Sequence, residues 1–225
     1  MLVLCSRLQM STILEDIRRY VFPLYLGTDP ASIPTGTTIV SPDRNFLGNA
    51  FFIARNGVAL TAGHCIPPEE GVPPGQTVLA VLWDGSTVVA HEVLASMTFA
   101  DSDIGIIKVA ATPAHYLPIS FATLRMGEDV SAVGIPQHSV SGRGKEFRYL
   151  KGHVTFSSRF LELSFAAPLG MSGSPVFSGD RVAAVLVGNA RSEALEDSTR
   201  RHRRPPLARC VACLACAPTR RPLRS

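Results

Sequence analysis

A serine lies between two glycines, immediately ahead of an apolar run, in the segment Gly170-Met171-Ser172-Gly173. The residues at 175–177 that follow are typical of a β-strand. Glycines on both sides allow the backbone to turn sharply and to aim the N–H groups of Gly170 and Ser172 at one point. Convergent N–H groups of this kind form an oxyanion hole, which stabilises negative charge on an acyl oxygen. The segment therefore predicts a nucleophilic serine at the entrance of a strand.

Two upstream segments supply the groups that such a serine needs. His64 lies in Thr-Ala-Gly-His-Cys at 61–65, and Asp103 begins Asp-Ile-Gly-Ile-Ile-Lys at 103–108. A serine hydroxyl is a poor nucleophile unless a base accepts its proton and a third group orients that base. The chain order His, Asp, Ser therefore indicates a catalytic triad of His64, Asp103 and Ser172.

Each member of this set has a competing interpretation. His64 alone could be an ordinary histidine at a strand end, and Asp101 competes with Asp103 as the orienting carboxylate. Ser174 also follows a glycine, although its side chain is expected to lie along the outgoing strand. The combination of the three segments favours the catalytic interpretation over the separate ones.

Together the three segments resemble the trypsin-like (chymotrypsin-fold) serine peptidases, particularly the compact bacterial members. The matching segments of that family read TA-x-HC, D-[IL]-x-x-[IL]-K and G-x-SG-x-P, and their register favours Asp103. The resemblance runs from about residue 46 to residue 188. It implies an all-β fold of two six-stranded antiparallel barrels. It also implies a serine endopeptidase that hydrolyses peptide or protein substrates through an acyl-enzyme and needs no cofactor.

The resemblance extends to the substrate pocket. It places Ala166 at the floor of the pocket and Gly188 on its wall, with Leu186 and Val187 on the adjoining strand, and we expect His153 to line it. The resulting pocket holds no charge that would select a Lys or Arg side chain. Relatives that are activated by cleavage have an aspartate before the nucleophile, where this chain has Met171. Relatives secreted by animals pair the cysteine after the histidine with one on the preceding strand, but no cysteine lies within 48–60.

The patterns predict five regions along the chain. They are a short helix near 11–20 and a connector in 1–36, a first barrel at 37–110, a linker at 111–126, a second barrel at 127–197 and a tail at 198–225. The first strand is expected near 37–40. Two hairpins are predicted at Asn56-Gly57 and Asp84-Gly85, because Asn-Gly and Asp-Gly are strong two-residue turn signals.

The tail at 198–225 is rich in Arg, Pro, Ala and Cys and lacks apolar periodicity, so we predict that it is disordered. The second barrel would then lack closing strands and be incomplete at its C-terminal side. The abrupt change of composition suggests a non-native reading frame or a divergent terminus. The cysteines at 210, 213 and 216 lack a fourth ligand for an iron–sulfur cluster, and tail composition explains them better.

Charge and composition narrow the other possibilities. The formal net charge is +4, but eight of the 22 basic residues lie in the tail, which has no Asp or Glu. The rest of the chain is acidic on balance, so we expect no nucleic-acid partner. The histidines lack ligand-spaced acidic or cysteine neighbours, so we predict no metal site. No apolar run long enough for a signal peptide or a membrane span is present, which favours a cytoplasmic protein of bacterial type, and the oligomeric state is left open.

Two other functions fit the same residues. The incomplete second barrel is consistent with a non-catalytic, protease-like binding module. An esterase could use the same triad on the same fold.

Overall fold

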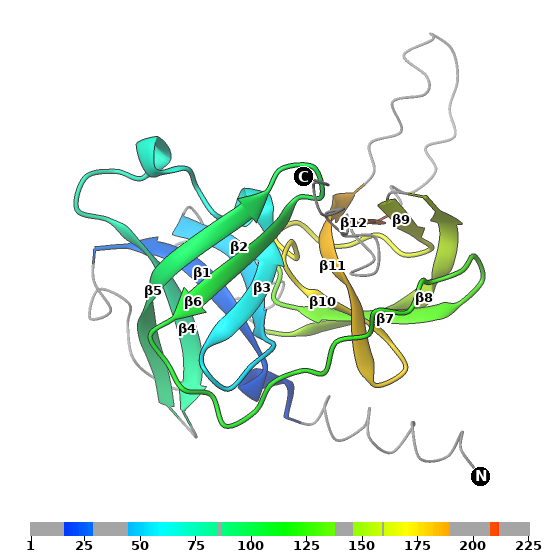
Figure 1. The fold of residues 1–225 in the computed structure, drawn as a ribbon, viewed down its shortest axis with the longest axis horizontal. Helices are drawn as coiled ribbons and strands as arrows, with labels where there is room; N and C mark the ends of the chain where they lie inside the picture. Colours follow the sequence, from blue (N-terminus) through cyan, green and yellow to red (C-terminus); the bar gives the residue numbers. More distant parts are fainter. Residues whose placement is uncertain are drawn as a thin grey trace, which may run out of the picture.

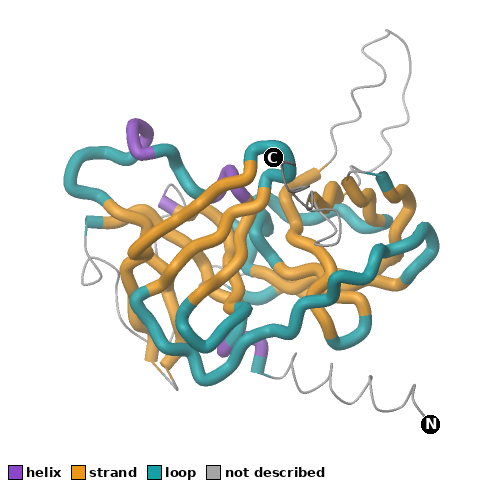
Figure 2. Tube along the Cα trace, in the orientation of Figure 1, coloured by secondary structure: helices purple, strands orange, loops and turns teal. Residues whose placement is uncertain are grey.

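The computed structural model describes residues 16–28, 45–84, 87–137, 146–158, 160–189 and 208–211, and this part of the chain is nearly all β-structure (Figure 2). The first sheet consists of β1 (Val21–Gly27), β2 (Phe46–Phe52), β3 (Val58–Ala62), β4 (Thr77–Asp84), β5 (Thr87–Phe99) and β6 (Ile104–Val109). The second consists of β7 (Asp129–Gly134), β8 (Arg148–Ser157), β9 (Phe160–Leu163), β10 (Pro175–Ser178), β11 (Arg181–Asn189) and β12 (Ala208–Val211). Three short 3-10 helices are also present, η1 (Ile17–Arg19), η4 (Gly63–Cys65) and η5 (Glu69–Gly71).

The first sheet closes into an antiparallel barrel in the order β1-β2-β3-β6-β5-β4 (Figure 1). Both predicted hairpins are present in it. β2 and β3 are joined at Asn56-Gly57, where Gly57 has a φ of +81°, a value that glycine adopts without strain. β4 and β5 pair from Leu79 and Glu92 up to Asp84 and Thr87. The turn signals in the sequence therefore located these two hairpins correctly.

The first barrel begins earlier than the sequence predicted. Only a helix and a connector were expected within 1–36, yet β1 spans Val21–Gly27 and includes Pro23. Pairing of β1 with β4 begins only at Leu24, so the missing N–H of Pro23 is not needed by that neighbour. The strand expected near 37–40 and most of the helix expected near 11–20 lie outside the described residues. Of that helix, only the 3-10 turn η1 is described.

The second sheet follows the order β10-β11-β12-β9-β8-β7, with β7 paired back to β10. Its closure is thin, because β7 and β10 meet at only two residue pairs, Ala132 with Val176 and Ser131 with Phe177. The predicted fold of two six-stranded antiparallel barrels is confirmed, and the second barrel is the less complete of the two.

The tail prediction does not hold at residues 208–211. Their backbone forms β12, which pairs with β11 on one side and with β9 on the other. The physical reason is that β9 and β11 would otherwise present unpaired N–H and C=O groups, which an added strand satisfies. The remainder of the predicted tail lies outside the described residues.

The two barrels share an apolar cluster where they meet. Residues of both barrels contribute to it, including Val21, Phe51 and Leu60 from the first barrel and Val133, Phe177 and Val185 from the second. Leu117, in the segment that joins the barrels, is also part of this cluster and fully buried. Burial of this much apolar surface holds the barrels against each other, so residues at their junction keep a defined geometry.

Candidate active site

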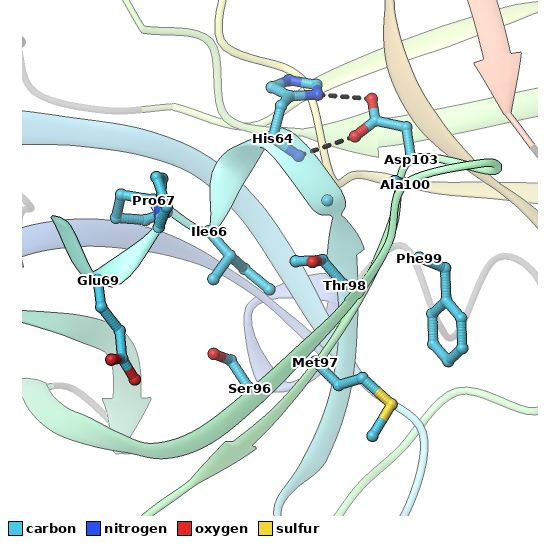
Figure 3. A pocket seen from close by; sticks show the side chains of 12 residues that line it. His64, Ile66, Pro67, Glu69, Ser96, Met97, Thr98, Phe99, Ala100 and Asp103 are labelled. Atoms are coloured by element: carbon cyan, nitrogen blue, oxygen red, sulfur yellow. Dashed lines mark hydrogen bonds and ion pairs between the residues drawn. The ribbon is translucent and has the colours of Figure 1, made fainter. Parts of the chain in front are cut away.

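His64 and Asp103 are brought together by adjacent strands of the first barrel. β3 pairs with β6, and His64 lies in η4 directly after β3 while Asp103 lies directly before β6. His64 Nδ1 is 2.7 Å from Asp103 Oδ2, and the backbone N–H of His64 donates to Asp103 Oδ1 at 2.8 Å (Figure 3). One carboxylate therefore holds both the ring and the main chain of His64.

Asp103 adopts an unusual backbone conformation to make these contacts. Its φ is +49°, and it is the only residue other than glycine with a positive φ among the described residues. Aspartate tolerates the left-handed region better than most residues, and such conformations cluster at functional sites. The backbone carbonyl of Asp103 also accepts a hydrogen bond from Gly63 N–H at 2.7 Å, which fixes the turn that carries the histidine.

The pKa of His64 is raised from 6.5 to about 10, chiefly because Asp103 accepts a hydrogen bond from the ring and favours its charged form. A contact with the Cys65 side chain adds to the shift, while partial burial of the ring opposes it. In this resting arrangement the imidazole therefore holds its proton more tightly than a free histidine. A proton acceptor is generated when that proton is lost.

Cys65 is a buried free thiol. A Cβ added at Gly48, on the neighbouring strand β2, would come within 2.4 Å of Cys65 Sγ. The Cys65 thiol therefore occupies the space that a side chain at position 48 would need, so only glycine fits there.

Ser172 lies on the loop that connects β9 to β10. Its Oγ donates a hydrogen bond to the carbonyl oxygen of Val187 at 3.1 Å, and within the described chain no hydrogen bond joins it to His64. Gly170 and Gly173 on either side have φ values of +88° and +81°, as the glycine pattern predicted. A Cβ at Gly173 would lie 1.8 Å from the carbonyl oxygen of Asn49, so no larger residue fits there.

The two predicted oxyanion donors are the N–H groups of Gly170 and Ser172. Neither is bonded to an acceptor elsewhere in the described residues, whereas the N–H of Met171 donates to the Pro168 carbonyl at 3.2 Å. Met171 itself is 1 % exposed and packs into the core of the second barrel. Two N–H groups at this loop are therefore available to an acceptor that arrives from outside.

The rival residues occupy different surroundings. Ser174 is 0 % exposed, and its Oγ is buried without a hydrogen-bond partner. Asp101 is exposed in the turn before β6, and it is Asp103, not Asp101, whose carboxylate contacts His64.

The residues expected to form the substrate pocket are spread over the second barrel. Ala166 is exposed in the loop after β9, and His153 is exposed on β8, where its backbone N–H donates to Ser164 Oγ. Gly188 is half-buried on β11, and a Cβ added to it would meet nothing within 4 Å. Leu186 and Val187 lie beside Gly188 on β11, where Leu186 is 0 % exposed and belongs to the core and Val187 is half-buried. No observation joins Ala166, Gly188 and His153 in one enclosed pocket.

A cavity of about 390 Å³ lies on the first-barrel side of His64 (Figure 3). One wall is the chain from Gly63 to Glu69, and the other is the end of β5 from Ser96 with the turn after it, including Ala100 and Asp103. Met97 and Phe99 on that wall are 59 % and 44 % exposed. The sequence did not identify this cavity, because its two walls are far apart along the chain.

Asn49 is a second feature that sequence analysis missed. It is 0 % exposed in the middle of β2, and its side-chain amide bonds to the Gly170 carbonyl on the serine loop. The signal that could have found it is a polar residue inside the apolar run at 46–52, because a buried amide must find partners.

The described residues contain no group of three or more His, Cys, Asp or Glu side chains that could hold a metal ion. In the same part of the chain, no helix has both the length and the apolar character needed to cross a membrane.

Comparison with known proteins identifies the family of this chain. Residues 48–188 match the model of the trypsin-like peptidase domain, so the chain belongs to this family of proteases. A search of curated proteins finds no significant match.

Solved structures of bacterial serine proteases share the fold. The active form of the Rv3671c protease from M. tuberculosis has a TM-score of 0.62 and 15% identity, covering 90% of this chain and 80% of that one. The serine endoprotease from Yersinia pestis has a TM-score of 0.58 and 16% identity, covering 87% of this chain and 60% of that one. The MamO protease domain from Magnetospirillum magneticum has a TM-score of 0.57 and 12% identity, covering 88% and 93%. At these identities the similarity concerns the fold.

Proposed function

We propose that this chain is a serine endopeptidase in which Ser172 attacks the acyl carbon, His64 accepts its proton and Asp103 orients His64. The observation that carries the proposal is the pair of hydrogen bonds that the Asp103 carboxylate accepts from His64, one from ring Nδ1 at 2.7 Å and one from the backbone N–H at 2.8 Å. A carboxylate in this position selects the imidazole tautomer whose other nitrogen, Nε2, can take the serine proton.

The reaction follows from these roles. Neutral His64 takes the proton as Ser172 Oγ bonds to the substrate carbonyl carbon, and the negative oxygen of the tetrahedral intermediate accepts hydrogen bonds from Gly170 and Ser172 N–H. Each such donor typically contributes about 2.7–4 kcal/mol to lowering the barrier. His64 then gives its proton to the leaving amine, and water hydrolyses the acyl-enzyme by the same route in reverse.

Ser172 must change its hydrogen bond before it reacts. Its hydroxyl donates to Val187 in the resting structure, and a rotation about its Cα–Cβ bond would free it for His64. Catalytic hydrogen bonds in substrate-free proteases are often long or absent and form only with substrate bound.

The test is covalent labelling by a fluorophosphonate, which reacts only with an activated serine. We expect the wild-type protein to be labelled at Ser172 and Ser172→Ala to be neither labelled nor active. The variant should keep a melting temperature close to that of the wild type, since the change removes one partly exposed hydroxyl.

Ser174→Ala is the matched control and should still be labelled, because Ser174 is buried. Labelling of Ser172→Ala to the wild-type extent would move the nucleophile away from this residue.

A non-catalytic binding module is the second candidate. The hydrogen bond from Ser172 to Val187 favours it, because a serine locked in that position cannot transfer its proton to His64. A wild-type protein that stays unlabelled while binding peptides would support this candidate. If labelling occurs, parallel panels of peptide and ester substrates separate a peptidase from an esterase.

A further inference from the structure

Asn49 connects the two barrels to the serine loop through its side chain. Nδ2 donates to the carbonyl oxygens of Ile135 at 3.0 Å and Gly170 at 2.9 Å, and Oδ1 accepts from Ile135 N–H at 2.8 Å. Both donors and the acceptor of this fully buried amide are therefore used. A network of satisfied buried polar groups rigidifies the segments that it joins.

The main chain of Asn49 binds the same loop. Its N–H donates to the Ser172 carbonyl at 2.7 Å, and its own carbonyl accepts from Thr61 Oγ1 at 2.6 Å. The loop also packs tightly here, because a Cβ on Gly173 would collide with the Asn49 carbonyl. Side chain and backbone of one residue thus hold the carbonyls of both Gly170 and Ser172.

The segment that Asn49 secures also orients the Gly170 N–H. Two residues beyond Ile135, the N–H of Gln137 donates to the Leu169 carbonyl at 2.8 Å. The Leu169 carbonyl and the Gly170 N–H belong to one trans peptide, so they point in opposite directions. Fixing that carbonyl against Gln137 therefore also fixes the direction of the Gly170 N–H, which points away from Gln137.

We propose that Asn49 is the positioning residue of the oxyanion hole: it holds the serine loop in the conformation that presents the Gly170 and Ser172 N–H groups. This proposal rests on the proposed peptidase function. Met171, next to the nucleophile, is uncharged and buried, so the loop is ordered by hydrogen bonds from β2 and the Ile135–Gln137 segment instead of by an ion pair at that position.

The experiment compares Asn49→Ala and Asn49→Ser with the wild type and with Val21→Ala. Val21 is also 0 % exposed but packs in the cluster between the barrels, so its variant controls for general loss of stability. Hydrogen exchange at residues 168–173, kcat and KM on one peptide substrate, and melting temperature are measured for all four proteins.

We expect Asn49→Ala to exchange at least about tenfold faster at residues 168–173 and to lose about 10²–10³ in kcat, which is the usual effect of losing one oxyanion donor. KM should change less than about threefold, because the interaction is needed in the transition state. Asn49→Ser, which keeps a hydroxyl donor, should show a smaller change of the same kind. Val21→Ala should lower the melting temperature without altering kcat or the exchange of this loop.

Unchanged loop exchange in a folded Asn49 variant would overturn the proposal, as would a rise in KM at constant kcat. If Asn49→Ala does not fold, a wild-type kcat in Asn49→Ser has the same meaning. Hydrogen exchange needs no activity, so it decides the role of Asn49 even when the wild-type protein fails to react with the fluorophosphonate. That failure would count against the proposed function alone.

Discussion

At the scale of single residues, the site depends on two polar side chains that each make several hydrogen bonds. Asp103 serves His64 twice, and Asn49 serves three backbone groups with one amide. Asn49 is fully buried, so water does not compete for its hydrogen bonds, whereas the contacts of Asp103 with His64 remain partly open to solvent. Small changes at these residues should therefore have large and specific effects.

The pKa of His64 gives a prediction for pH dependence. It is raised to about 10 by Asp103, and only the neutral ring accepts a proton, so kcat/KM should rise with pH through an apparent pKa above 6.5. Asp103→Asn should bring this apparent pKa back toward 6.5 and lower kcat by about 10⁴. The measurement is kcat/KM of both proteins between pH 5 and 10, and a flat profile in the wild type would remove His64 from the mechanism.

The same shift affects stability with a defined sign. The folded state binds the His64 proton more tightly than the unfolded state, so this contribution is complete below pH 6.5 and is lost as the pH rises toward about 10.

Ser174 provides a prediction about folding stability. Its hydroxyl is buried without a partner, and an unsatisfied buried group costs about 1–3 kcal/mol. Ser174→Ala should therefore raise the free energy of unfolding, by about 1 kcal/mol, in urea titrations monitored by fluorescence. A loss of stability of similar size would mean that the hydroxyl has a partner, such as a bound water.

At the scale of elements, the loops around β11 are where substrate selectivity should arise. Gly188 on β11 faces open space, and Ala166 in the loop after β9 is small and uncharged. A basic P1 side chain bound against Ala166 and Gly188 would find no counter-ion in either residue, which is unfavourable.

Substrates with Ala, Val or Leu at P1 should therefore exceed those with Arg or Lys in kcat/KM by about tenfold, which corresponds to ~1.4 kcal/mol of transition-state binding. A P1 library measures this directly. Preference for Arg or Lys would refute the assignment of Ala166 and Gly188, and preference for Glu would indicate His153 as a determinant.

At the scale of the whole molecule, the second barrel depends on a strand that is distant in sequence. β12 pairs with both β9 and β11, and the rest of the closure is the short contact between β7 and β10. The loop that carries Ser172 leads directly into β10, so a loss of structure in this barrel would also displace Ser172. The first barrel has no such dependence, since its six strands all lie within 21–109.

Truncation tests this dependence on β12. Removing residues 208–225 should lower the melting temperature and promote aggregation, because the edges of β9 and β11 become unpaired. Removing only 212–225 retains β12 and is the matched control. Equal melting temperatures for the two truncated proteins, measured by differential scanning fluorimetry, would show that β12 adds nothing to the stability of the barrel.

The sequence by itself determined the features that short patterns encode. The turn pairs Asn56-Gly57 and Asp84-Gly85 located two hairpins of the first barrel, because these signals act between neighbours in the chain. The order of His64, Asp103 and Ser172 indicated the family, since the chemistry restricts which residue types can serve. The contact between His64 and Asp103 was predictable for the same reason.

Only the tertiary structure decided the features that depend on distant segments. Pro23 argued against a strand, but in the fold it pairs with Asn49 of β2, and β1 pairs with β4 only from Leu24 onward. Likewise, β12 acquires its conformation from the edges of β9 and β11. The sequence shows Asn49 as a polar residue inside an apolar run but does not show which groups it binds, because its partners Ile135 and Gly170 are 86 and 121 residues away. The partners of Asn49 are determined by the requirement that buried polar groups form hydrogen bonds. This requirement arises only once the two barrels have packed together.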